Sequence, residues 1–134
     1  MAFPSLGGGY QVTDGNVNEP IIGVQGDPAT VASAATLTIA QLLTGLIVGN
    51  SGQTANQAYT LPTVTLTEAT LVNPKTNSTF EFAVVNLGTS SGTITMTAGT
   101  GWTLVGNAVV AVTSSARFLA RKTGDSAWSL YRVA

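Results

Sequence analysis

The sequence predicts an all-β fold, namely an antiparallel β-sandwich, a jelly roll or a small barrel, with one or two short helices and an extended amino-terminal arm. Threonine and valine are abundant, and both suit a pleated sheet better than a helix because branching at Cβ restricts their rotamers. Short runs in which apolar and polar residues alternate recur along the carboxy-terminal half, with turn-forming residues between them. No repeat of fixed period is evident, which argues against a solenoid.

The arm is expected over residues 1–27. Glycine-rich or proline-containing turn sequences occur at 7–9, 14–16 and 26–28, and no period of 2 or 3.6 residues persists between them. The segment nevertheless contains more apolar side chains than a solvated tail usually carries, so we expect it to lie along another surface. The side chains expected to make this contact are Phe3, Tyr10, Val12, Ile21 and Ile22. Residues 28–134 are expected to form the β-rich domain.

The strands are predicted from alternation and from the turn residues that bound them. They are expected at 46–48, 59–61, 79–86, 93–98, 102–105, 108–112, 117–122 and 127–133. Hairpin turns are expected at 88–92 and 99–101 because glycine brackets both segments. Short helices are expected at 40–44 and 65–72, the second beginning at Thr65, which has Glu68 three residues later as in a capping box.

The residue types of most catalytic and metal sites are missing. The chain has no cysteine and no histidine, which excludes disulfides, thiolate nucleophiles, Cys/His zinc sites and Ser-His-Asp triads. Glu68 and Glu81 would act as a glycosidase pair only if the fold held them about 5–10 Å apart. We therefore expect no enzyme activity, no cofactor and no metal site.

Charged residues make up only 8 % of the chain, against about 25 % in a typical globular domain. Acidic residues predominate in the first 74 residues and basic residues in the remainder. Two interpretations stay open: the two signs meet between neighbouring subunits, or they lie on different faces of one molecule. The side chains expected to make inter-subunit charge contacts are Arg117, Arg121, Arg132, Asp14 and Glu19. A net charge of −1 argues against binding to nucleic acid.

Two parts of the chain carry a family resemblance. The first has Leu-Gly-Gly-Gly-Tyr-Gln at 6–11, Asp-Gly-Asn at 14–16 and Asn-Glu at 18–19. The second has Gly-Trp-Thr-Leu-Val-Gly at 101–106, Ser-Ala-Arg-Phe at 115–118 and Leu-Tyr-Arg-Val at 130–133. Together they resemble capsid decoration (cement) proteins of tailed bacteriophages and related head or tail appendage modules.

The resemblance implies a virion structural protein that binds the outside of an icosahedral capsid and stabilises contacts between major capsid proteins. It implies a homotrimer or a dimer, with the trimer favoured and the arm clamping the major capsid protein. No apolar run is long enough to span a membrane and no secretory signal is evident, so we expect assembly in the host cytoplasm and no membrane contact. The alternative function is a receptor- or carbohydrate-binding module of a phage fibre or spike, which should display tryptophan and tyrosine in exposed loops.

Overall fold

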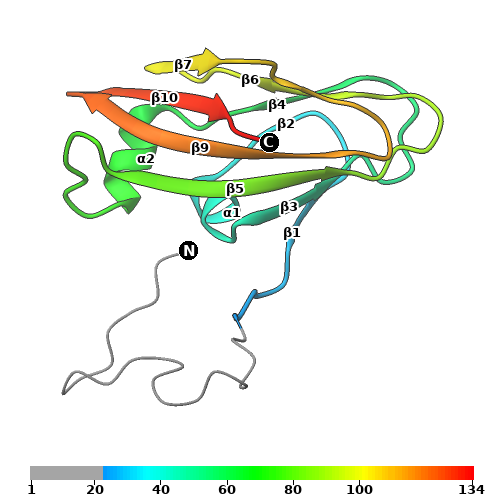
Figure 1. The fold of residues 1–134 in the computed structure, drawn as a ribbon, viewed down its shortest axis with the longest axis horizontal. Helices are drawn as coiled ribbons and strands as arrows, with labels where there is room; N and C mark the ends of the chain where they lie inside the picture. The colour runs from blue at the N-terminus through cyan, green and yellow to red at the C-terminus, as the bar shows by residue number, and fades with distance from the viewer. Residues whose placement is uncertain (1–22) are drawn as a thin grey trace.

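The computed structural model describes residues 23–134. The expected arm contacts at Phe3, Tyr10, Val12, Ile21 and Ile22, and the acids Asp14 and Glu19, lie outside the described residues. The described part of the chain is mostly β and forms two sheets and two short helices (Figure 1).

The larger sheet has six strands in the order β1-β3-β5-β9-β10-β7, and the smaller has four in the order β2-β4-β6-β8. The larger contains β1 (Ala29–Val31), β3 (Leu46–Gly49), β5 (Thr79–Asn86), β7 (Trp102–Val105), β9 (Ser115–Gly124) and β10 (Ala127–Arg132). The smaller contains β2 (Ala35–Thr36), β4 (Gln57–Thr60), β6 (Ile94–Thr97) and β8 (Val109–Val110). The helices are α1 (Ile39–Leu43) and α2 (Val64–Thr70).

The chain changes sheet at every strand from β1 to β9, so that odd-numbered strands belong to the larger sheet and even-numbered strands to the smaller one. From β1 to β6 the chain returns to each sheet in the same direction, so successive strands of one sheet are parallel there, whereas the returns from β6 to β8 and from β7 to β9 reverse direction. The pairs β1–β3, β3–β5, β2–β4, β4–β6 and β7–β10 are parallel, whereas β5–β9, β9–β10 and β6–β8 are antiparallel.

Both sheets are therefore mixed, and the prediction of antiparallel sheets is wrong for five of the eight pairings. The hairpins expected at 88–92 and 99–101 are also wrong, because each of these segments joins strands of different sheets. Alternation along a strand shows that one face is buried, but it carries no information about which strand pairs with it.

One cluster of buried side chains lies between the two sheets and receives residues from both. Phe82 of β5 stacks on Phe118 of β9 with ring centroids 5.6 Å apart, and Trp102 and Trp128 are equally close to each other. The largest side chains with less than 2 % exposure are Trp128, Tyr59, Phe82, Phe118, Leu37, Leu42, Ile47, Leu61, Ile94, Met96, Leu130 and Val84. The fold is thus stabilised by burial of aromatic and branched groups without any disulfide.

Both helices begin at a threonine N-cap. Thr38 and Gln41 form a reciprocal capping box at the start of α1. In α2 the N-cap is Thr63, whose hydroxyl accepts a hydrogen bond from the backbone N–H of Leu66 at 3.3 Å. The cap predicted at Thr65 is therefore wrong by two residues, since Thr63, directly after Pro62, is extended and caps the helix, and Val64 is buried in the core. No helix in the described range is long and apolar enough to cross a membrane.

Candidate functional site

The outer face of the four-stranded sheet carries no charged side chain. The side chains that alternation directs outward are Thr36, Ala58, Thr60, Thr95, Thr97 and Val109. The register aligns Thr36 with Thr60 and Thr97 in one row, and Ala58 with Thr95 and Val109 in the next. We call these six residues the threonine face. It offers methyl groups and hydroxyls, which suit contact with another protein better than chemistry on a substrate.

The outer face of the six-stranded sheet is apolar at its centre. Its apolar side chains are Leu46, Val48, Ala83, Val85, Val105, Leu119 and Tyr131, and we call them the apolar face. One row runs from Glu81 through Leu119 and Tyr131 to Val105. Helices α1 and α2 lie on the inner side of this sheet, because Leu42 and Val64 belong to the core cluster. No described element therefore covers the apolar face.

Arg117 and Arg121 flank the apolar face, as their spacing on one strand predicts. Arg117 pairs with Glu81 at 3.4 Å, but the two side chains are 59 % and 50 % exposed, so the pair contributes at most about 1 kcal/mol. Arg121 lies between Thr79 and Ser129 in the register. Its Nη1 atom is buried, and no described residue accepts a hydrogen bond from it.

Arg132 does not join the other two arginines. Its guanidinium donates hydrogen bonds to the backbone carbonyls of Asn107 and Val109, and Nε donates to the carbonyl of Ala134. Arg132 therefore fastens the β7–β8 connection to β10. Because Asp14 and Glu19 lie outside the described residues, the predicted inter-subunit charge contacts stay a prediction.

A partly buried ion pair, missed by the sequence interpretation, joins α2 to the larger sheet. The side chain of Lys122 is only 9 % exposed, and its ammonium donates a hydrogen bond to Glu68 Oε1. Trp128 Nε1 donates to the same oxygen at 3.2 Å. These two donors, Lys122 first, hold the pKa of the Glu68 carboxyl below its usual range. Side chains of adjacent residues in a strand point to opposite faces of the sheet. This alternation alone predicts that Lys122 and Arg121 lie on different faces of the larger sheet.

The structure does not bring Glu68 and Glu81 together. Glu68 contacts the inner side of the six-stranded sheet through Lys122, whereas Glu81 lies on the outer side of the same sheet. A glycosidase requires two carboxyl groups that face one substrate. This pair therefore does not form a catalytic arrangement.

Two buried asparagines link the sheets at one end of the core. Asn86 Nδ2 donates to the carbonyls of Gly92 and Val110, both at 3.0 Å, and Asn86 Oδ1 accepts from Gly88 N at 2.8 Å. Asn50 Nδ2 donates to Asn86 Oδ1 at 3.2 Å. Asn86 ends β5 of the larger sheet and Val110 belongs to β8 of the smaller one, so the side chain of Asn86 bridges the two layers.

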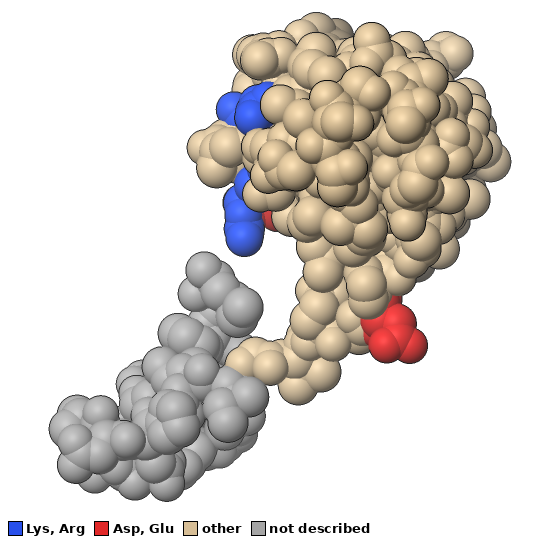
Figure 2. All heavy atoms as spheres, turned by 90° about the vertical axis from the view of Figure 1, so that its right-hand side faces the viewer, with Lys and Arg blue, Asp and Glu red and all other residues tan. Residues whose placement is uncertain are grey.

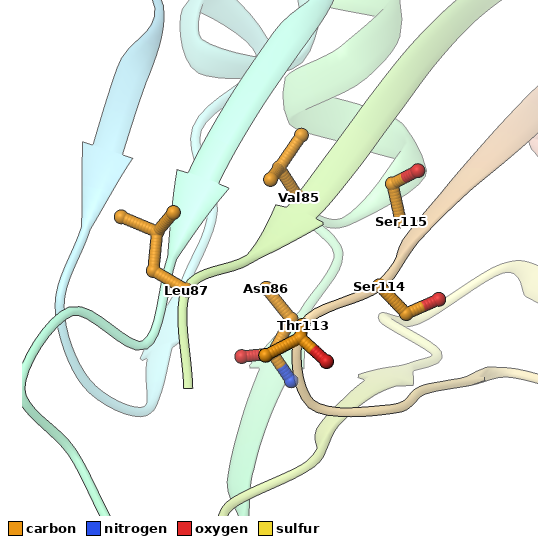
Figure 3. Close-up of a pocket in the computed structure, with 6 residues that line it drawn as sticks. All are labelled: Val85, Asn86, Leu87, Thr113, Ser114 and Ser115. Atoms are coloured by element: carbon orange, nitrogen blue, oxygen red, sulfur yellow. The ribbon is translucent and has the colours of Figure 1, made fainter. Parts of the chain in front are cut away.

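Neither of two surface hollows in the described part of the chain is lined by a titratable group. The first measures about 380 Å³ and lies where β5 ends and β9 begins (Figure 3); it is lined by Val85, Asn86, Leu87, Thr113, Ser114 and Ser115. The second measures about 330 Å³ and lies between the β2–α1 segment and α2. Its lining residues are Thr36, Leu37, Thr38, Ile39, Pro62, Leu66, Ala69 and Thr70, and we call it the helix groove. Leu66 is 59 % exposed there, which fits contact with an apolar group of a partner.

Among the described residues, no three acidic side chains gather closely enough to hold a metal ion. No protein-family model matches the sequence, and neither the curated proteins nor the solved structures include a significant match. The resemblance to phage decoration proteins therefore stays a prediction.

Proposed function

We propose that this protein is a non-enzymatic structural subunit of a phage virion. In this proposal it binds the outside of an icosahedral capsid as a small oligomer, with a trimer favoured, and stabilises contacts between major capsid proteins. The two sheets around one core are taken as a β-sandwich. The observation that carries the proposal is that an entire layer of the fold, the four-stranded sheet, has no ionic group on any strand.

The charges of the described chain are confined to a few places. Those on regular elements lie on α2, β5, β9 and β10. On the face drawn in Figure 2, the atoms of charged residues occupy a few spots on a largely uncharged surface. Soluble domains usually distribute lysine and glutamate over all outward faces, whereas the centres of protein interfaces are depleted of charge. The threonine face and the helix groove, which share Thr36, therefore form the surface that we assign to the capsid contact.

The small area of this surface favours binding by several subunits of an oligomer together over tight binding by one subunit. Four strands spaced about 4.8 Å apart, of which β4 and β6 are four residues long and β2 and β8 only two, cover at most roughly 15 by 13 Å, or about 200 Å². A stable protein interface buries about 800 Å² on each partner, so even with the helix groove the contact of one subunit is small. An oligomer that binds through several copies of the surface gains avidity without any new type of contact. Many such contacts over a shell then oppose separation of the capsid proteins.

The fibre-module alternative finds less support in the described residues. A sugar-binding surface usually presents aromatic faces, but Trp102 is 6 % exposed, Trp128 1 % and Tyr59 is fully buried. These three rings pack in the core. Within residues 23–134 both tryptophans and Tyr59 therefore serve packing, and Tyr131 on the apolar face is a single half-buried ring, which favours the structural proposal.

The proposal is tested by co-sedimentation with capsids that lack the protein. Thr95→Arg places a charge at the centre of the threonine face, between Ala58 and Val109. Thr123→Arg is the matched control, since it makes the same exchange on β9 in the other sheet. We expect Thr95→Arg to weaken capsid binding at least tenfold, because an unpaired charge would be desolvated, and the control to bind like the unmodified protein. Equal binding by both variants would refute the assignment of the surface, and a monomer in solution at micromolar concentration would refute the oligomer.

A further inference from the structure

The apolar face has no role in the function proposed above. It presents seven apolar side chains across β3, β5, β7, β9 and β10, of which Val105 at the edge is 45 % exposed and the other six are half-buried. In a two-sheet protein with one core, outward positions are usually polar. Such a face needs either a partner or a covering segment to keep the molecule soluble.

Arg121 indicates that the partner or segment covering the apolar face should carry a negative charge. Its buried Nη1 donates to no described residue, and a buried charged donor without an acceptor is unfavourable. Among the described acids, Glu68 contacts Lys122 and Glu81 contacts Arg117, while neither Asp27 nor Asp125 contacts Arg121. The two acids that remain in the chain are Asp14 and Glu19, and residues 1–22 contain no basic side chain.

The position where the described chain begins brings these acids within reach. Gln25 Nε2 donates a hydrogen bond to the carbonyl of Thr44 at 2.6 Å, which fixes the entering chain beside the turn before β3. The chain then forms β1, which lies three strand positions from β9 in the larger sheet. At about 4.8 Å for each position, β1 and β9 are about 14 Å apart. Glu19 is four residues before Gly23 and can extend about 13 Å before its side chain is counted, and Asp14 can extend about 30 Å.

We propose that residues 1–22 dock along the outer face of the six-stranded sheet of the same molecule. A carboxylate of Asp14 or Glu19 accepts a hydrogen bond from Arg121, and the apolar side chains of the segment cover the apolar face. The segment expected from sequence to clamp a capsid protein thus serves first as the cover of its own sheet. This inference does not depend on the proposed function.

The absence of cysteine in the chain allows a direct test with a single spin label. Thr103→Cys lies in the same row as Arg121, two strands away and about 10 Å from it, whereas Ala58→Cys lies on the threonine face. In the isotope-enriched full chain we expect a label at position 103 to reduce the amide signals of residues 1–22 at least twofold. A label at position 58 should leave them unchanged.

A mixed sample distinguishes docking within one molecule from docking between molecules. When the label is on unenriched copies and the enriched copies carry none, the signals should stay at full intensity. The combined change Asp14→Asn and Glu19→Gln should restore at least half of the signal lost in the Thr103→Cys protein, while Asp27→Asn should restore none. Three results would overturn the inference: no loss from position 103, equal loss from both positions, or loss that appears in the mixed sample. Unchanged docking in the Asp14/Glu19 variant would overturn the assigned role of Arg121.

Discussion

Replacing Asn86 by alanine measures how strongly the buried amide holds the two sheets together. The side chain of Asn86 is 2 % exposed and makes four hydrogen bonds, two as donor and two as acceptor, which use its full capacity. At about 1 kcal/mol for each bond, their loss costs about 4 kcal/mol. Such a loss is a large fraction of the 5–15 kcal/mol that usually stabilises a domain. For a chain of this length it corresponds to a decrease in Tm of about 10–15 °C.

The assay is urea unfolding followed by tryptophan fluorescence, since Trp102 and Trp128 are both buried in the folded state. Asn107→Ala is the control, because the side chain of Asn107 accepts one hydrogen bond, from Val109 N, at an exposed position. We expect the control to lose less than about 1 kcal/mol. If Asn86→Ala lost no more than Asn107→Ala, the amide would not hold the layers together and the reasoning would be wrong.

Burial raises the pKa of Tyr59 above its usual 10.0, more than the hydrogen bond from the Asn50 backbone lowers it, so the unfolded chain ionises first. The contribution of Tyr59 to stability is therefore fully present below about pH 10 and is lost as the pH rises further. In thermal melts between pH 8 and 11, the Tm of Tyr59→Phe should decline less with rising pH than that of the unmodified protein. The pKa of Glu68 is lowered from 4.5, mainly by the hydrogen bond from Lys122, so its contribution is present above about pH 4.5 and is lost as the pH falls through the lower folded-state value. Melts from pH 3 to 6 should accordingly be flatter for Glu68→Gln, and an unchanged slope would count against the ion pair. Gly99→Ala should cost about 1–3 kcal/mol, because the new Cβ would overlap backbone carbonyl oxygens of the β4–α2 connection, whereas Gly124→Ala meets no atom within 4 Å and should change urea stability by less than about 0.5 kcal/mol.

The strands of the carboxy-terminal half could be predicted because their pattern is local. Each strand from β5 onward overlaps a range expected from alternation, and the predicted 79–86 coincides with β5. Phe82 and Phe118 face inward for the same reason, since every second residue of a strand faces the core. The shared face of Arg117 and Arg121 follows from the same period of two.

The pairing of the strands could not be predicted, because it depends on contacts between distant residues. Nothing in the local pattern distinguishes a turn that reverses within a sheet from a connection that crosses to the other sheet, and the segment at 88–92 is of the second kind. The bond from Lys122 to Glu68 spans 54 positions, and the bond from Asn50 to Asn86 spans 36. Polar contacts of this range become evident only when the fold places the two side chains together.

The position of β10 between β9 and β7 determines when the larger sheet can be completed. Among the described strands of this sheet, β7 pairs with β10 alone, although β10 is the last of them in sequence. Strand β7 is therefore synthesised roughly two dozen residues before β10, and until β10 follows it is an unpaired edge without a charged side chain. A nascent chain that stalls before residue 127 lacks β10 and leaves that edge exposed to other chains, so the larger sheet is completed only after β10 has been synthesised.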